Sequence, residues 1–187
     1  MESVTCHAYK LEVNDNFRES GQACLHLWCL DRNSHPVRLR VEDFPHFCFM
    51  ELPQFVDGRP KQWVEGDVNL LLQRISAMLS ADAPTEWALV QRAKLYYDRG
   101  GKTYPMVMLN FRSQNAMRHC HNLVKKNLRY GDLGTVVLRV WEDTINIFRK
   151  FFTNRRCRYA QWFTVQGTVV SLDDRLSVEG TTEAPHS

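Results

Sequence analysis

The sequence predicts a mixed α+β protein, and three observations predict it. Hydrophobic residues make up 44% of the 187 positions, which is enough for a sizeable core and too much for a disordered chain. Several short segments alternate apolar and polar residues, as half-buried strands do. Two longer segments repeat apolar residues at the spacing of an amphipathic helix.

The first quarter of the chain is expected to be strands. The predicted strands are residues 5–13, 22–31, 36–42 and 46–51. The third of them alternates strictly, with Val37, Leu39 and Val41 expected inward and the arginines between them outward.

Helices and strands alternate in the middle of the chain. A helix is expected over residues 67–80, because its apolar residues form one stripe. A hairpin is expected from strands 86–97 and 104–111 around Arg99–Lys102. Ser113 is a suitable N-cap for a second helix over residues 114–128, and residues 135–140 are expected to be a strand.

From residue 46 the predicted order is β-α-β-β-α-β, which indicates a ferredoxin-like, or RRM-like, core. We therefore expect an N-terminal antiparallel β extension at 1–45 and the core at 46–140. A helix and a Trp-bearing strand are expected at 141–176, and a linker or disordered tail at 177–187.

The charge and the cysteine content restrict the possible class of protein only slightly. The net charge is +3, but Lys94 to Arg158 holds fourteen Lys and Arg against four Asp and Glu, and the tail from Tyr159 is mildly acidic. Most of the six cysteines fall in apolar runs, which favours a reducing, intracellular compartment. No apolar run approaches the length needed to cross a membrane, and the N-terminus does not read as a targeting sequence.

The sequence shows no catalytic constellation, so no catalytic residue, metal ligand or cofactor is expected in this chain. Tyr130-Gly131-Asp132-Leu133 resembles part of a polymerase metal motif, but it lacks the second carboxylate that two-metal chemistry needs. His119, Cys120 and His121 point about 100° apart on a helix, so they cannot converge on one ion.

Two basic groups are candidates for phosphate contacts. The first lies near Tyr159 and Trp162 and comprises Lys150, Arg155, Arg156 and Arg158. Arginines beside aromatic residues suit phosphates and stacked bases, although a solvated turn has the same composition. The second comprises Lys125, Lys126 and Arg129, where the helix dipole alone also favours cations.

Aromatic residues on the predicted sheet have two interpretations. The residues are Phe47, Phe49, Tyr96, Tyr97, Tyr104 and Phe111. Sheet aromatics stack bases in RRM-like modules, but more often such residues belong to the core.

The segment from Trp141 to Gln166 carries a family resemblance. Glu142 precedes Ile145 and Ile147, and Lys150, Phe151 and Phe152, a turn and Trp162 follow. This layout resembles the last segment of the N-terminal domain of family B DNA polymerases, just before the 3′→5′ exonuclease domain. Leu39–Pro53 and Tyr104–Phe111 resemble earlier parts of that domain. Lys150, Asn154 and Tyr159 stand where the family usually has Arg, Asp and Gly, which indicates a divergent member, delta-like or from a large DNA virus.

The resemblance implies a non-catalytic domain of a DNA-directed DNA polymerase. Such a domain packs against the exonuclease and polymerase domains, scaffolds them and helps to guide the single-stranded template. Ser187 stands about where the first exonuclease carboxylates are expected. A viral polymerase would act in the host nucleus or at a cytoplasmic replication site. No residue set supports the template-uracil pocket of archaeal relatives. A stand-alone RRM-like single-strand-binding module and a protein-interaction domain are the alternatives.

Overall fold

The computed structural model describes residues 2–14, 23–42, 44–93, 102–126, 128–129, 133–172 and 175–179, and it divides the chain into two compact units. Unit 1 combines residues 1–45 with residues 145–187, and unit 2 is the segment between them, residues 46–144. Unit 2 is therefore an insertion into unit 1.

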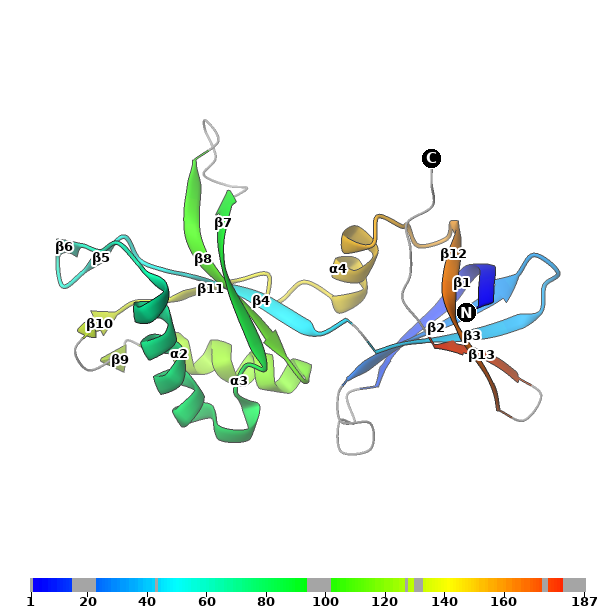
Figure 1. Ribbon diagram of the computed structural model, residues 1–187, viewed down its shortest axis with the longest axis horizontal. Coiled ribbons are helices and arrows are strands. Elements are labelled where there is room, and N and C mark those ends of the chain that lie inside the picture. Colours follow the sequence, from blue (N-terminus) through cyan, green and yellow to red (C-terminus); the bar gives the residue numbers. More distant parts are fainter. Residues whose placement is uncertain are drawn as a thin grey trace. The chain divides into compact units, whose positions relative to one another are not determined.

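Unit 1 is a closed barrel of five strands (Figure 1). They are β1 (Glu2–Asn14), β2 (Cys24–Asp31), β3 (Pro36–Val41), β12 (Trp162–Leu172) and β13 (Arg175–Glu179). Around the barrel the order is β1-β2-β3-β13-β12, and every pairing is antiparallel except that of β3 with β13. Helix α4 (Ile147–Asn154) lies between the third and fourth strands in the sequence. This strand order with a helix at that point is the topology of an OB-fold barrel.

Strand β1 closes the barrel by pairing on both of its edges. It pairs with β12 from Glu2 to His7 and with β2 from Cys6 to Asn14, and a bulge lies between Ala8 and Lys10. A bulge bends and twists a strand, which lets one long strand coil around a small barrel. The inward alternation predicted for β3 is confirmed, because Val37, Leu39 and Val41 are all buried.

The two ends of the chain are grouped differently from the sequence-based expectation. Residues 1–45 do not form a separate extension, because β1 pairs with β12 in the same barrel. Residues 177–179, expected in the tail, belong to β13 and pair with β3. Residues 180–187 lie outside the described residues. Pairings between segments so far apart in sequence leave no local pattern, so the alternation alone could not reveal them.

Unit 2 contains a four-stranded sheet of order β11-β4-β8-β7 in which all neighbours are antiparallel. The strands are β4 (His46–Glu51), β7 (Glu86–Ala93), β8 (Thr103–Phe111) and β11 (Arg139–Trp141). Helices α2 (Glu65–Leu79) and α3 (Gln114–Val124) share one core with one face of the sheet, which includes Met50 and Leu109 from the strands and Leu71 and Cys120 from the helices (Figure 1). The chain is thus a mixed α+β protein with antiparallel sheets.

Short elements connect the main ones in unit 2. They are β5 (Phe55–Val56), β6 (Arg59–Pro60), a 3₁₀ turn (Ser80–Asp82), β9 (Leu128–Arg129) and β10 (Thr135–Val136). The single strand expected at 135–140 is split, because β10 pairs with β9 whereas β11 pairs with β4. The predicted cap of the second helix is confirmed, since Ser113 Oγ accepts a 3.1 Å hydrogen bond from the N–H of Ala116.

Candidate nucleic-acid interface

Helix α4 anchors the arginine-rich segment of unit 1. Asn146 caps its N-terminus, because Oδ1 accepts a 2.9 Å hydrogen bond from the N–H of Phe148. Phe151 is fully buried, with its ring edge-on to Phe44 at 5.3 Å, and Phe152 lies beside it at 5.4 Å. These aromatic contacts hold the last turn of a short helix in place.

The helix ends in a Schellman turn. The N–H of Cys157 donates to the carbonyl of Phe152 at 3.0 Å, and that of Arg156 donates to the carbonyl of Thr153 at 3.3 Å. Arg156 holds the left-handed position of this motif, with φ 52°. Glycine is usual there, because a side chain disfavours this conformation by about 1–2 kcal/mol.

A second tight turn follows at once. The N–H of Gln161 donates to the carbonyl of Arg158 at 3.3 Å, and Ala160 takes φ 66°, again a value that favours glycine. Between the two turns, the hydroxyl of Tyr159 donates to the carbonyl of Tyr9 on β1 at 3.0 Å. This bond fixes the Tyr159 ring against the barrel.

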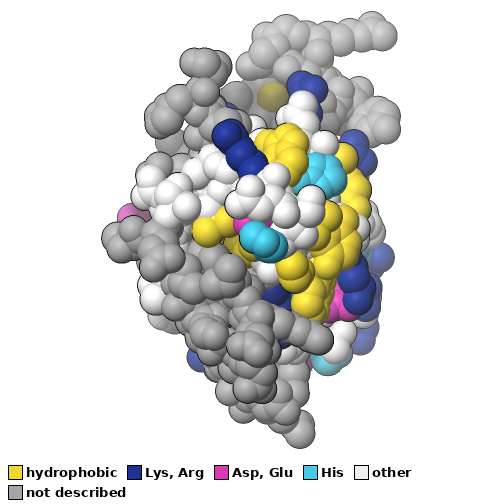
Figure 2. Space-filling view, turned by 90° about the vertical axis from the view of Figure 1, so that its right-hand side faces the viewer, with side chains coloured by type: hydrophobic (Ala, Val, Ile, Leu, Met, Phe, Trp, Pro, Cys, Tyr) yellow, Lys and Arg dark blue, Asp and Glu magenta, His cyan; other side chains and the backbone are white. Residues whose placement is uncertain are grey.

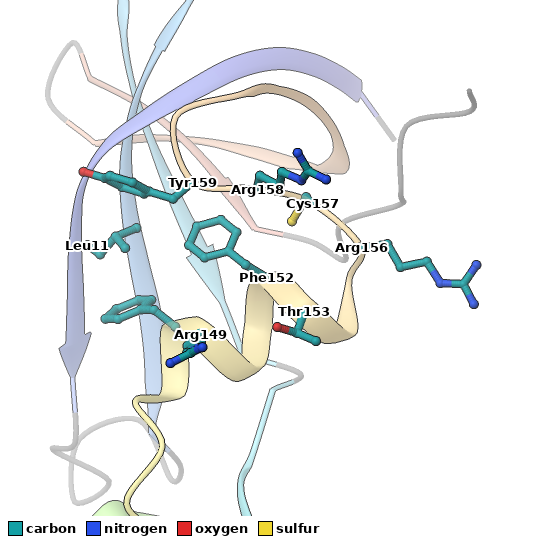
Figure 3. A pocket seen from close by; sticks show the side chains of 9 residues that line it. Leu11, Arg149, Phe152, Thr153, Arg156, Cys157, Arg158 and Tyr159 are labelled. Atoms are coloured by element: carbon teal, nitrogen blue, oxygen red, sulfur yellow. The ribbon is translucent and has the colours of Figure 1, made fainter. Parts of the chain in front are cut away.

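The two turns border an open pocket of about 660 Å³ between α4 and β1 (Figure 3). Its lining consists of Leu11, Phe148, Arg149, Phe152, Thr153, Arg156, Cys157, Arg158 and Tyr159. Apolar and aromatic side chains supply most of the wall. Arg158 lies beside Cys157 over the pocket, whereas the side chain of Arg156 extends outward (Figure 3). Burial raises the pKa of the Cys157 thiol, which keeps this part of the wall neutral.

The charged residues that line the pocket are all basic. Arg149, Arg156 and Arg158 are exposed, and none has a carboxylate partner among the residues that the structure describes. Among the described residues that line the pocket there is no Asp or Glu. Guanidinium groups without a partner among the described residues are available for an external anion, and they bind phosphate with two parallel hydrogen bonds.

Of the first predicted basic group, Arg156 and Arg158 lie at this pocket and Arg155 is half-buried beside it. Lys150, the other predicted phosphate contact of this group, is only 7% exposed. The physical reason is helical spacing. Ile147, Lys150 and Phe151 stand at i, i+3 and i+4, so they share the buried side of α4.

The sequence-based candidates omitted Arg149. It stands four residues before Thr153 and seven before Arg156, and all three line the pocket. A helical projection of α4 could have separated this solvent side from the buried side that carries Lys150. The residues alone did not mark α4 as the wall of a pocket.

The second predicted basic group lies in unit 2. Lys125 and Lys126 are exposed just after α3, where their backbone N–H groups donate to His121 and Leu123. Arg129 belongs to β9, but its side chain lies outside the described part of the chain, as does the hairpin tip around Arg99–Gly101. The structure therefore assigns the two basic groups to different units.

The predicted sheet aromatics divide between two faces. Phe111 is buried in the core between sheet and helices. Phe47 and Phe49 alternate with the core residues of β4, so they belong to the opposite face, and the guanidinium of Arg92 lies 4.3 Å from the Phe49 ring. Tyr104 is half-buried on β8, and Tyr96 and Tyr97 fall outside the described residues.

A second group of cations and an aromatic ring lies on strands β1 to β3. Lys10 and Arg38 lie 5.7 and 5.4 Å from the ring of Trp28, whose Nε1 donates to Glu12 at 2.9 Å. Lys10 also pairs with Glu12 at 2.5 Å, and Arg38 donates to His26 at 3.0 Å. These groups satisfy one another, unlike the arginines of the pocket.

Exposed aromatics also mark unit 1. Trp162 on β12 is 51% exposed and its ring lies 5.8 Å from that of His7 on β1. Figure 2 shows hydrophobic and histidine side chains side by side on one face of this unit, with basic side chains near its edge. Such a surface suits contact with another macromolecule.

The cysteines are buried, and His119 and His121 have acidic partners. All six cysteines are free and buried, and burial raises the pKa of Cys120 to about 12. His119 pairs with Asp82 at 2.5 Å and His121 pairs with Asp143. Among the described residues, no group of three or more His, Cys, Asp and Glu is placed to hold a metal ion. The described helices include none long and apolar enough to span a membrane.

Known structures supply a match for this fold. The chain is similar to the family B DNA polymerase from the hyperthermophilic archaeon Pyrobaculum calidifontis, with a TM-score of 0.68 and 12% sequence identity. The match covers 95% of this chain and 20% of that polymerase, so the chain spans about a fifth of its length. No model of a known protein family matches the sequence, and no curated protein sequence matches it. The two-unit architecture is therefore one that a family B DNA polymerase contains.

Proposed function

We propose that this chain is the N-terminal region of a family B DNA polymerase, divergent in the manner of delta-like or large-DNA-virus enzymes. The observation that carries the proposal is the fold similarity to a polymerase of this family over 95% of the chain. The layout of Trp141–Gln166 supports it from the sequence side, because α4, the arginine-rich turns and Trp162 follow in the order that the family shows.

The region itself is non-catalytic and scaffolds the exonuclease and polymerase domains of the parent enzyme. Unit 2 is a ferredoxin-like module, which its strand order supports. Numbered along the unit, β4, β7, β8 and β11 are strands one to four, and the order β11-β4-β8-β7 is then 4-1-3-2, the order of that fold. Unit 1 adds an OB-type barrel, a fold that binds oligonucleotides in other proteins.

The region guides the single-stranded template through contacts to its phosphates. Arg149, Arg156 and Arg158 are the residues that we assign to this role. They are exposed on one side of unit 1 and have no carboxylate partner among the described residues. Lys125 and Lys126 add a weaker contact in unit 2.

A stand-alone RRM-like single-strand-binding module is the second candidate. One observation favours it: the half-buried Phe47 lies on the sheet face opposite the helices, where RRM modules stack bases. This candidate predicts that Phe47→Ala reduces binding more than loss of the arginines does.

Binding of a labelled single-stranded oligonucleotide, measured by fluorescence anisotropy over a salt series, tests the proposal. The variant R149A/R156A/R158A is expected to bind about tenfold or more weakly and to show a flatter salt slope, since each lost phosphate contact on a single strand removes about 0.7 unit of slope. The matched control is R32A/R112A/R118A, which removes three exposed arginines elsewhere in the chain. Equal affinity and slope in the two variants would remove the assignment.

A further inference from the structure

We propose that the pocket between α4 and β1 holds one unstacked nucleotide of the bound single strand, with the base among its aromatic rings and the adjoining phosphates on its arginines. This inference rests on the proposed function and gives the strand a defined place in unit 1.

The shape of the pocket suits a nucleotide. Its volume of about 660 Å³ is within the usual range for sites that take small organic ligands, roughly 300–1,000 Å³. Phe152 is a buried part of its wall, and Phe148 and Tyr159 present more exposed rings. Stacking on such rings tolerates any base, because every base has a π-face. A replicative template needs this tolerance.

The aromatic wall is fixed before a ligand arrives. The ring of Tyr159 is held at its hydroxyl by the carbonyl of Tyr9 and contacts Phe152 at a centroid distance of 6.1 Å. Phe152 is in turn packed against Phe151. A wall that is already ordered loses little conformational entropy on binding, so more of the stacking energy appears as affinity.

The charges at the edge fit phosphates on both sides of one base. Arg149 comes from the helix and Arg158 from the segment between the two turns, so they approach from different parts of the chain (Figure 3). Single-stranded nucleic acid has a phosphate on each side of every base. The described lining residues include no carboxylate, which disfavours a cationic ligand.

The backbone around Arg158 and Tyr159 is consistent with a positioning role. Arg156 and Ala160 bracket these two residues, and both take positive φ values that favour glycine. Strained conformations of this kind gather where the direction of a side chain matters for function. The two turns determine where Arg158 and Tyr159 point.

The test compares a short single-stranded oligonucleotide with an abasic strand of the same length, using the full 187-residue chain. Both strands have the same phosphates, so a difference in affinity reports contacts to the bases. We expect the natural strand to bind about tenfold more tightly, as one stacked base allows. Phe148→Ala is expected to abolish this difference without changing affinity for the abasic strand.

Three further variants make the result specific. Tyr159→Phe retains the ring and is expected to retain most of the preference. Trp162→Ala removes an exposed aromatic outside the pocket lining and is expected to leave the preference unchanged. Thr153→Trp fills the pocket from an exposed position of α4 and is expected to abolish the preference, which provides a second test if Phe148→Ala fails to fold.

The outcomes separate the two proposals. If wild-type protein binds both strands equally and the arginine variant weakens both, the pocket assignment is overturned while the proposed function stands. If the preference exists but survives both Phe148→Ala and Thr153→Trp, the base binds elsewhere and the assignment also fails. If neither strand binds the wild-type chain, the proposed function fails together with this inference.

Discussion

The exits of helices α3 and α4 carry similar sequences but different structures. Each is followed by a group of basic residues, Lys125 and Lys126 after α3 and Arg155 to Arg158 after α4. After α3 the lysines are exposed, and the helix dipole alone would favour cations there. After α4 the chain makes two tight turns that place arginines at the edge of an aromatic pocket. Basic charge marks both regions, and in the second the described residues form a frame that could orient a ligand.

The loop before β10 and the turns after α4 differ in how they meet the need for positive φ. The loop uses Gly134, with φ 76°, whereas the turns use Arg156 and Ala160. Glycine adopts this conformation without strain, and a residue with a Cβ does not. We infer that stability shapes the loop before β10 and that function shapes the turns after α4.

Removing the anchor of α4 is expected to have the largest effect. Phe151→Ala should lower the free energy of unfolding by about 3–5 kcal/mol, because it empties a fully buried aromatic site. Cys120→Ala at a fully buried position of α3 should cost much less, because far less volume is lost. Urea denaturation of both variants measures the two changes in the free energy of unfolding. Similar small losses would mean that α4 is not held by its aromatic contacts.

Gly134→Ala is expected to cost about 2 kcal/mol or more of unfolding free energy. A Cβ at this position would overlap the carboxylate of Asp57, and its φ is positive as well. The control is Gly66→Ala in α2, where a Cβ would meet no atom within 4 Å. That change should stabilise the protein by about 0.5–1 kcal/mol, since alanine favours a helix. A thermal melt that ranks the two variants the other way contradicts the strain argument.

Arg156→Gly is expected to raise stability and weaken binding at the same time. Glycine relieves the left-handed conformation, by about 1 kcal/mol, and removes a phosphate contact worth roughly a two- to fivefold change in affinity. Arg156→Ala should lose the same affinity without the gain in stability, because alanine retains a Cβ. Denaturation of the two variants measures the effect of backbone conformation on stability, and anisotropy measures the effect of the lost charge on affinity. A loss of stability in Arg156→Gly would show that the left-handed residue is not strained.

K125A/K126A is expected to have the smallest effect. Affinity for a single strand should fall by less than about twofold at moderate salt, because these side chains add charge without an oriented site. Stability should change by less than about 0.5 kcal/mol, as for most exposed positions. An effect as large as that of R149A/R158A, measured in the same salt series, would give both helix exits the same role.

Much of the local structure could be predicted from the residues. The stripe beginning at Val68 predicted α2 to within two residues at its start, and Ser113 marked the start of α3. The alternation of Val37, Leu39 and Val41 placed the buried face of β3. These signals are local, because helix and strand periodicities depend on neighbours only a few residues away.

The candidate site was predictable in part. Clustered arginines beside aromatics pointed to Arg156 and Arg158, but composition could not show that Lys150 faces inward and Arg149 outward. That distinction depends on which side of α4 packs against the rest of unit 1. Phe44, about a hundred residues earlier in the sequence, contributes to that packing.

The sequence by itself determined the mixed α+β class, most of the elements and the basic character of the segment after α4. Only the tertiary structure decided that the two ends of the chain close one barrel, with unit 2 inserted in the sequence between them, and that α4 and β1 border a pocket. The physical reason is the range of the interactions. The periodicity of a helix or strand depends on residues that are close in sequence. Strand partners and pocket walls depend on burial and hydrogen bonding between segments that are far apart in sequence.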